Sequence, residues 1–315
     1  MNTPSNVPPG SSVESRVAAP RIKAANDLMY WSIRRELWEN RSITIAPLAV
    51  AAFALFILLM TTAFTLSHKM RNLPTLDAAK RHAAVVSHFS VAPTVIMVTT
   101  ILVGIFYSLD ALYGERRDRS ILFWKSLPVS DLTTVLSKAA IPLVVLPLIG
   151  FALSVATQLI LLLWSTVVLM GSGMSPAPFW AELRLLEMPV TQIYGIGAFT
   201  LWHAPMYGWL LLVSTWAKRT PILWAVLPMV VISVVERVTF QTSYFGSLLK
   251  YRFMGAMTAA FNVKATAKGH YEIIDRFDQL NPFKFLGTPG LWLGLLLAAA
   301  FLAAAVRLRR YREPI

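Results

Sequence analysis

The sequence predicts an all-α polytopic membrane protein with six transmembrane helices, and two observations support this. Hydrophobic residues make up 56% and charged residues only 14% of the 315 residues. The apolar residues also form runs of about 20 residues, the length that a membrane-spanning helix needs. The formal net charge is +13, but Lys and Arg stand mostly at the ends of the apolar runs. This placement is typical of membrane topology, whereas a soluble nucleic-acid-binding protein gathers its basic residues on a solvated face.

The N-terminal part differs in composition from the rest of the chain. Residues 1–26 are rich in Ser, Pro, Asn and Ala and lack the apolar run of a signal peptide. We expect them to form a disordered cytoplasmic tail, and residues 27–315 to form a single transmembrane domain.

An amphipathic helix is predicted for residues 27–41, with its charged residues away from the apolar side. We expect this helix to lie in the membrane interface with its aromatic side chains at headgroup depth. The alternative is a simple extension of the first span. The apolar and aromatic residues of this side are Met29, Tyr30, Ile33, Leu37 and Trp38.

The third apolar run is longer than a membrane requires. A helix over residues 131–170 would measure about 60 Å, twice the thickness of the hydrocarbon layer. Its first turns must therefore stand outside the membrane or the helix must bend, and Pro142 and Pro147 are natural kink positions. The six predicted spans are 43–66, 89–113, 139–170, 190–216, 222–235 and 291–306.

A long and moderately apolar connection, residues 239–288, precedes the last span. Residues 247–261 have a helical pattern, and Asn281-Pro282 and Pro289 are expected to interrupt the chain. Six spans place both termini on one side of the membrane. Lys and Arg gather at both termini, in the loop between the second and third spans and in the short turn at Lys218-Arg219, so that side is expected to be cytoplasmic.

Several kinds of chemistry are excluded by missing residues and motifs. The chain has no cysteine, which excludes disulfides, thiolate metal sites and cysteine nucleophiles. It also has no phosphate-binding loop, no His-Glu-x-x-His zinc motif and no Gly-x-Ser-x-Gly elbow. We therefore expect no catalytic residues, no metal site and no ATPase activity on this chain.

Three ionisable residues near or inside the predicted spans are candidate functional groups. His203 inside the fourth span could relay ions, or it could be a neutral imidazole bonded to a neighbouring helix. Asp110 and Glu236 are expected to be interfacial ion pairs or charges at helix ends. The tryptophans are expected to form mostly an aromatic belt, with substrate stacking as the alternative. These tryptophans are Trp164, Trp180, Trp202, Trp209, Trp216, Trp224 and Trp292.

The densest charged block, residues 114–138, lies between two long apolar runs. Residues 115–126 contain no Gly or Pro and predict a short amphipathic helix, which Pro128 ends. Ser130 or Asp131 can cap the helix that follows. Large apolar side chains come directly after the charges, at 121–124, and they need a partner or lipid headgroups to cover them. The alternative for this block is an ordinary solvated loop.

This block resembles the loop between the second and third spans of ABC-2-type transporter permeases. In that family an acidic-basic pair opens a coupling helix and a Leu-Pro-hydrophobic-Ser turn closes it. The pattern differs at Asp118-Arg119, where many family members have a Gly near the Ser or Thr. The residues that carry the resemblance are Glu115-Arg116, Ser120, Leu127-Pro128-Val129-Ser130 and Lys138.

The resemblance implies a transmembrane permease subunit of an ATP-driven ABC transporter of the inner membrane, with export as the usual direction. The expected partners are a separate ATPase subunit, which would hold ATP and Mg, and a second permease subunit in a homodimer or heterodimer. Residues 239–288 would form short outer re-entrant helices. The residues that the resemblance and the neighbouring apolar side chains assign to ATPase docking are Glu115, Arg116, Arg117, Asp118, Arg119, Ser120, Phe123, Trp124, Leu127 and Pro128.

Two other functions stay open at this point. One is a membrane-embedded enzyme that uses His203 with Asp110 or Glu236, which would have to lie together beside a water-filled cavity. The other is a membrane scaffold that does not transport. The transported substrate cannot be read from the sequence, and a lipid, peptide antibiotic, drug, polysaccharide or ion would each be compatible with it.

Overall fold

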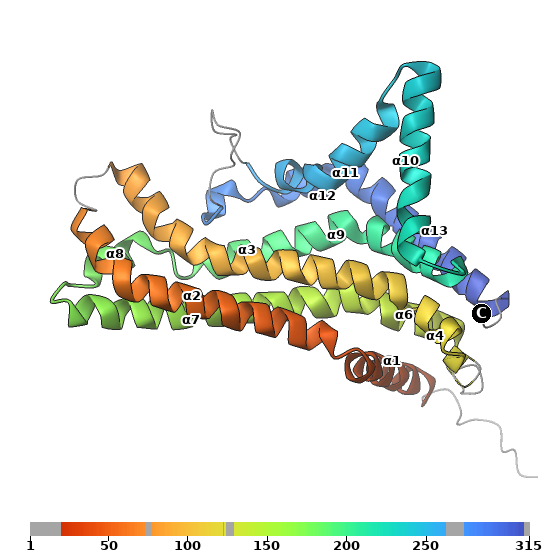
Figure 1. Ribbon diagram of the computed structural model, residues 1–315, viewed down its shortest axis with the longest axis horizontal. Helices are drawn as coiled ribbons and strands as arrows, with labels where there is room; N and C mark the ends of the chain where they lie inside the picture. The colour runs from red at the N-terminus through yellow and green to blue at the C-terminus, as the bar shows by residue number, and fades with distance from the viewer. Residues whose placement is uncertain (1–19, 73–76, 122, 124–128, 263–273, 312–315) are drawn as a thin grey trace, which may run out of the picture.

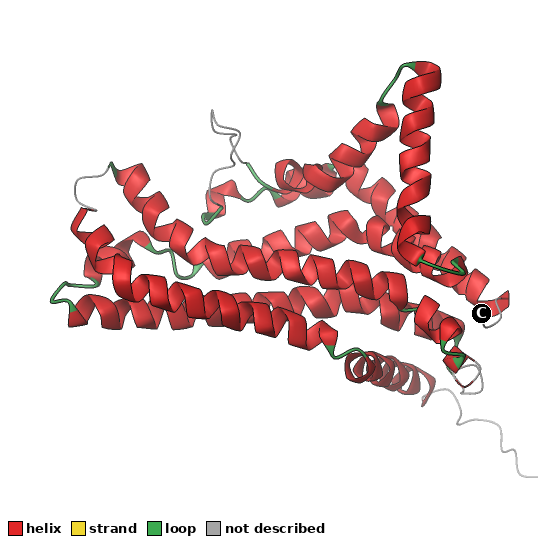
Figure 2. Cartoon of the chain, in the orientation of Figure 1, coloured by secondary structure: helices red, strands yellow, loops and turns green. Residues whose placement is uncertain are grey.

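A computed structural model describes residues 20–72, 77–121, 123, 129–262 and 274–311. The regular structure in these ranges is helical, as Figure 2 shows, and the only strand-like pairing among them is an isolated bridge between Phe261 and Leu280. The prediction of an all-α protein is therefore confirmed.

Six helical segments are long and apolar enough to cross a membrane, as predicted. Each extends beyond the apolar run that predicted it, because more polar turns continue the helix at one or both ends. The six segments are Ser42–Arg71, Lys80–Arg117, Asp131–Gly171, Ala177–Trp216, Pro221–Phe240 and Pro289–Tyr311.

The first part of the chain contains α1 Pro20–Glu39, α2 Ser42–Asn72, α3 Ala78–Asp110, α4 Tyr113–Arg117, α6 Asp131–Ala140, the π-helical turn η2 Ile141–Val145 and α7 Leu146–Gly171. The second part contains α8 Ala177–Glu182, α9 Glu187–Trp216, α10 Pro221–Phe240, α11 Tyr244–Ala260, the 3-10 turn η3 Phe277–Gln279, α12 Pro282–Gly287 and α13 Pro289–Tyr311.

The long helices α2, α3, α7 and α9 run along one another and form the body of the molecule (Figure 1). Phe89, Ile96, Leu161 and Phe179 are buried between α2, α3, α7 and α8. Helix α13 packs along α9 and completes the bundle. Burial of these side chains holds the helices against one another. Each helix is apolar on more than one face and can therefore pack against more than one neighbour.

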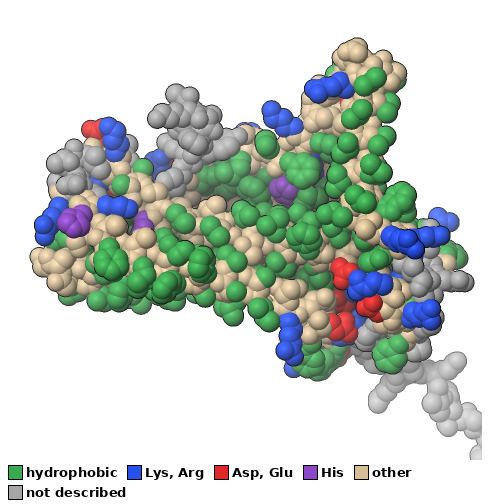
Figure 3. Space-filling model, in the orientation of Figure 1, with side chains coloured by type: hydrophobic (Ala, Val, Ile, Leu, Met, Phe, Trp, Pro, Cys, Tyr) green, Lys and Arg blue, Asp and Glu red, His purple; other side chains and the backbone are tan. Residues whose placement is uncertain are grey.

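The two ends of the bundle carry different elements. We call one the α4 end, where α1, α4, the start of α6 and the end of α13 meet, and the other the α8 end, where α8 lies beside the start of α3 (Figure 1). Charged side chains gather toward these two ends and on α10 and α11, while hydrophobic side chains cover the stretch between the ends (Figure 3). This distribution suits a body that spans a membrane.

Helices α10 and α11 form an arm that rises from the bundle and returns to it (Figure 1). Only 6% of the apolar window of α10 is buried, which is the lowest value among the six segments. The tip of the arm is a tight turn with Gln241 in the left-handed region at φ 51°. The Glu236 carboxylate accepts hydrogen bonds from the backbone N–H groups of Tyr244 (2.6 Å) and Phe245 (2.9 Å) there. A carboxylate at a helix start satisfies N–H groups that have no partner within the helix.

The expected irregularity in the third span is present. The π-helical turn Ile141–Val145 contains Pro142, and Pro147 lies in the first turn of α7. Proline has no backbone N–H to donate, and its ring clashes with the carbonyl of the preceding turn. The helix widens into a π-helical turn at Ile141–Val145, beside these two prolines. Helix α6 therefore continues into α7 through a distorted segment.

The N-terminal helix starts earlier than predicted. Helix α1 begins at Pro20, because proline is well suited to the first position of a helix and Ala24 and Ala25 favour its continuation. Residues 20–26 of the predicted tail are thus helical in the structure, and residues 1–19 lie outside the described ranges. The aromatic side chains of Tyr30 and Trp38 are exposed, as the predicted interfacial position requires.

The connection before the last span contains the predicted helix and breaks. Helix α11 covers most of 247–261, and Pro282 and Pro289 each open a new helix. The Asn281 side chain caps α12 by accepting a hydrogen bond from the Lys284 N–H at 3.0 Å. Helix α10 continues past the predicted end of the fifth span at 235, and the Glu236 carboxylate caps α11.

Candidate functional site

The loop at the α4 end is not the single amphipathic helix that residues 115–126 predict. Helix α4 ends at Arg117, and Arg119 takes the left-handed conformation with φ 58° before helical structure resumes at Ser120. The turn brings Ile121 into the interior, where its side chain is only 2% exposed. Burial of this side chain thus accompanies a conformation that residues other than glycine rarely adopt.

Glu115 joins α4 to two other helices through buried ion pairs. Its carboxylate lies 3.1 Å from the Lys138 ammonium of α6 and accepts a hydrogen bond from the Arg309 guanidinium of α13 at 2.8 Å. Arg309 also donates to Asp131 at 2.7 Å. Exposed fractions of 9% for Glu115, 2% for Lys138 and 4% for Arg309 show that these charges are shielded from solvent. Each charge therefore depends on its partners.

Glu36 of α1 completes this ion cluster. The Lys138 ammonium donates to both of its carboxylate oxygens at 2.9 and 3.0 Å, and the Tyr107 hydroxyl donates to it at 2.8 Å. Arg35 also donates to Glu36 at 2.8 Å. Burial alone would raise the pKa of Glu36, but the Lys138 charge and these hydrogen bonds outweigh it and hold that pKa below its ordinary value.

We call this group the ion cluster. It contains three carboxylates and three cations, so their formal charges balance, and it connects α1, α3, α4, α6 and α13. Its members are Glu36, Glu115, Asp131, Arg35, Lys138 and Arg309, with the Tyr107 hydroxyl.

Arg116 ties α4 to the end of α9. Its guanidinium donates to the carbonyl of Thr215 at 2.6 Å and to that of Ala217 at 3.2 Å. The Ser214 hydroxyl accepts hydrogen bonds from the backbone N–H groups of Leu112 (3.0 Å) and Tyr113 (2.8 Å). Helix α4 is consequently fixed to the bundle through both its side chains and its backbone.

The residues assigned to docking divide into two groups. Arg117, Asp118, Arg119 and Phe123 are exposed, and Ser120 is partly exposed. Trp124, Leu127 and Pro128 lie outside the described residues, so the structure says nothing of their positions.

Glu115 and Arg116 belong to the interior of the chain, in contrast to the expectation that they face a partner. The ion cluster and the α9 carbonyls bind both side chains within this chain, and a docking role for them stays a prediction. The sequence pattern located the loop but gave no signal for the cluster, because Glu36, Lys138 and Arg309 lie far apart along the chain.

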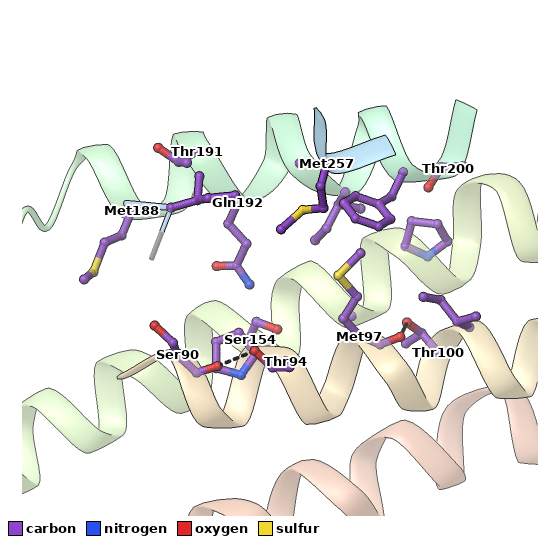
Figure 4. Close-up of a pocket in the computed structure, with 18 of the residues that line it drawn as sticks. Ser90, Thr94, Met97, Thr100, Ser154, Met188, Thr191, Gln192, Thr200 and Met257 are labelled. Atoms are coloured by element: carbon purple, nitrogen blue, oxygen red, sulfur yellow. Dashed lines mark hydrogen bonds between the residues drawn. The ribbon is translucent and has the colours of Figure 1, made fainter. Parts of the chain in front are cut away.

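A cavity of about 400 Å³, partly open to the molecular surface, lies between α3, α7, α9 and α11. Figure 4 shows hydroxyl, amide and thioether side chains from these helices directed into it. Its walls include Thr94 and Thr100 of α3, Ser154 of α7 and Gln192 of α9, all within membrane-spanning segments. The sequence did not identify this cavity, because its lining comes from four helices that are distant along the chain.

His203 lines the cavity, and its Nδ1 donates to the Phe199 carbonyl of its own helix at 2.8 Å. Asp110 lies at the α4 end, 3.7 Å from Arg117, and Glu236 lies at the tip of the arm. The structure therefore places neither Asp110 nor Glu236 beside His203, although the enzyme hypothesis requires one of them there. Among the described residues, no group of three His, Asp or Glu side chains could hold a metal ion.

The tryptophans do not all belong to an aromatic belt. Trp202 is completely buried, donates to the Arg252 carbonyl at 2.8 Å and has the Arg252 guanidinium 5.0 Å from its ring centre. Trp180, Trp224 and Trp292 are about half-exposed, which suits a belt.

Comparison with known proteins adds no relative. No protein-family model, curated protein or solved structure significantly matches this chain.

Proposed function

We propose that this chain is the transmembrane permease subunit of an ATP-driven transporter of the ABC-2 type, working with a separate ATPase subunit. Six apolar helices, an internal cavity lined by polar side chains and the resemblance of the 115–138 loop support the proposal. On this proposal the α4 end faces the cytoplasm, ATP and Mg bind to the partner, and a second permease subunit completes the transporter. Export is the direction that the resemblance implies.

The attachment of α4 is the observation on which the proposal chiefly rests. A loop that only joined two spans would need no buried ion pairs, whose charges are costly to remove from water. Here Glu115 and Arg116 bind α6, α9 and α13, while Arg117 at the end of α4 and Phe123 beyond it stay exposed. A force applied to the exposed part is thus transmitted to the spans through bonds that α4 already makes.

The mechanism follows from this arrangement. ATP binding closes the ATPase subunits and moves the surface on which the 117–123 segment is seated. Because α4 is fixed to α9 and α13, which pack along each other, the displacement tilts these two helices together. Helix α9 also forms a wall of the cavity, so its movement changes the shape and the access of the cavity.

The test is capture of an ATPase from membranes of the source cells, with the full chain carrying an affinity tag. The Arg117→Glu and Phe123→Ala variants should retain normal membrane abundance and lose most of the captured ATPase, because exposed charge and apolar contact at an interface both contribute to binding. Lys69→Glu with Arg71→Glu, which changes basic residues at the α8 end, serves as the matched control and should capture it normally.

Capture of no ATPase by the wild-type chain, or equal capture by all variants, would refute the proposal. A scaffold that does not transport would bind a partner through this loop but show no ATP-dependent movement of a substrate in vesicles. Turnover of ATP by the purified chain alone would also contradict it.

A further inference from the structure

The cavity has the size and position of a ligand site. Its volume of about 400 Å³ lies within the usual range of small-molecule pockets, about 300 to 1,000 Å³. It extends from Asp275 and Ile274 on the side of the α8 end to Tyr207 and Pro142 on the side of the α4 end. It therefore lies inside one chain, at the depth of the membrane-spanning helices.

Four hydroxyl groups in the cavity lining donate their protons to carbonyls of their own helices. The hydroxyls of Thr94, Thr100 and Thr191 donate to carbonyls of their own helices at 2.7, 2.8 and 2.7 Å. Ser90 does the same toward Val86 at 3.0 Å. Because a carbonyl accepts and cannot donate, the hydroxyl protons are used within the helices. The oxygen lone pairs of these side chains are then available to the space in the cavity.

Gln192 adds a stronger acceptor. Its Oε1 atom is buried and has no hydrogen-bond partner among the described residues. Figure 4 shows its side chain directed across the cavity toward Ser90 and Ser154. A buried amide oxygen without a partner is costly, and a ligand that donates an N–H or O–H at this point would remove that cost.

The charges around the cavity limit what can bind. No Lys or Arg occurs among the described residues that line it, and its single acidic residue is Asp275. Asp275 is bound at 2.7 Å by the Nε2 atom of His82. An anion would meet several acceptors and no neighbouring cation in the lining, whereas an uncharged donor or a cation would be favoured.

The remaining walls are apolar and adaptable. Met97, Met188 and Met257 come from α3, α9 and α11, and Phe199 and Ile196 contribute further apolar surface. Methionine side chains have three rotatable bonds and fit ligands of different shapes. The π-helical turn at Ile141–Val145 adjoins the same cavity through Pro142, and such turns are often found at functional sites.

We propose that the cavity binds an amphipathic small molecule that is uncharged or cationic and carries at least one hydrogen-bond donor. Its donor bonds Gln192 and the hydroxyl oxygens, and its apolar part lies against the methionine and phenylalanine side chains. This inference deepens the proposed function, since the ligand would be the transported molecule. Binding itself requires only this chain, so the two proposals can fail separately.

The test is binding of three fluorescent probes to the purified full chain in lipid nanodiscs. All three contain a dansyl group and the same alkyl chain, which ends in a primary amine, a carboxamide or a carboxylate. The amine and carboxamide probes should bind saturably, and the carboxylate probe should bind about tenfold more weakly or not at all. The carboxylate has no terminal hydrogen-bond donor, and the described residues of the cavity lining include no Lys or Arg to balance its charge.

Variants identify the groups that bind the probes. Gln192→Leu and the pair Thr94→Val with Thr100→Val should each weaken binding of the amine and carboxamide probes by about tenfold. Gln192→Glu should favour the amine probe over the carboxamide probe. Thr99→Val is the matched control, since its hydroxyl donates to the Val95 carbonyl of the same helix on an exposed side outside the cavity. Monodispersity and thermal unfolding of every variant show that it is folded.

The inference would be overturned if the carboxylate probe bound more tightly than the other two probes. It would also be overturned if the cavity variants bound the amine and carboxamide probes as tightly as Thr99→Val does. Absence of saturable binding together with normal ATPase capture would overturn it while leaving the proposed function intact. The expected probe binding without any captured ATPase would support a ligand-binding membrane protein and refute the transporter proposal.

Discussion

At the scale of single residues, Lys138 is the most demanding position in the molecule. Its ammonium lies within 3.1 Å of the carboxylates of both Glu36 and Glu115, and its side chain is 3% exposed. Two buried carboxylates would face each other without it. The helix α6 that presents it begins with the Ser130 side chain accepting from the Thr133 N–H at 3.1 Å, as the capping prediction expects.

We expect Lys138→Met to destabilise the chain by about 3 to 5 kcal/mol, because it removes the cation that two buried carboxylates, Glu36 and Glu115, share. Thermal unfolding in detergent measures this effect. Lys80→Met, which removes an ion pair with Asp77 whose side chains are 72% and 77% exposed, is the control and should change stability by about 0 to 1 kcal/mol. Adding Glu36→Gln to Lys138→Met should restore part of the lost stability. If the double variant were as unstable as Lys138→Met or less stable, the pairing of Lys138 with Glu36 would not stabilise the fold.

The same cluster makes stability depend on pH. The pKa of Glu36 is lower in the folded chain than in the unfolded chain, so folding is favoured by the ionised form. This contribution is fully present above the unfolded pKa of about 4.3 and is lost as the pH falls through the folded pKa. We expect the melting temperature of the wild type to fall below about pH 4.3. The fall should be smaller in Glu36→Gln, and equal slopes for both proteins would disprove the role of this group.

At the scale of elements, the break after α4 has a direct local cause. Arg119 has a left-handed backbone, which costs about 1 to 2 kcal/mol for a residue with a side chain. Many ABC-2-type permeases, whose loop this segment resembles, have a glycine near this position. Burial of Ile121 and the ties of Glu115 and Arg116 maintain the conformation here despite that cost.

Arg119→Gly should therefore stabilise the chain, by about 1 kcal/mol once the greater freedom of unfolded glycine is subtracted. Arg117→Gly, two residues earlier and inside α4, should destabilise it by about 1 kcal/mol, because glycine is unfavourable within a helix. Melting curves of the two variants and the wild type show whether each substitution stabilises or destabilises the chain. A loss in both variants would show that the left-handed conformation is not strained.

Elements could be predicted from the sequence much better than sites. The apolar runs are local features of the chain, so they located all six long helices, and Pro142, Pro282 and Pro289 marked interruptions through their missing N–H groups. The ion cluster joins residues as far apart as Glu115 and Arg309, 194 positions along the chain. No local pattern distinguishes such charges from surface charges, which is why Glu115 and Arg116 were assigned to a partner.

At the scale of the whole molecule, the two ends of the bundle have different chemical character. The α4 end contains the ion cluster, the basic end of α13 and the exposed part of the 113–123 segment. The α8 end has ion pairs between α3 and α8, such as Arg81 with Glu182 at 2.6 Å. The cavity lies between these ends and includes Asp275 on the α8 side. The proposed transporter needs this difference, because the ATPase would bind at the α4 end while the substrate would bind in the cavity.

The orientation of these ends can be tested because the chain contains no cysteine. Ser130→Cys and Thr220→Cys place a single exposed thiol at the α4 end, and Ser175→Cys places one at the α8 end. With a membrane-impermeant thiol reagent applied to sealed vesicles whose outer face is the periplasmic or external face, we expect only Ser175→Cys to be labelled. Lys and Arg gather near the α4 end and are retained on the cytoplasmic side.

Opening the vesicles with detergent should make all three thiols reactive, which shows that a lack of labelling reflects the membrane and not burial. Vesicles of inverted orientation should give the opposite pattern, with Ser130→Cys and Thr220→Cys labelled and Ser175→Cys protected. Labelling of Ser130→Cys from the external face would place α4 outside the cell. The exposed residues Arg117 and Phe123 could then not reach an ATPase that uses cytoplasmic ATP, and the coupling proposed for α4 would be excluded whatever the cavity binds.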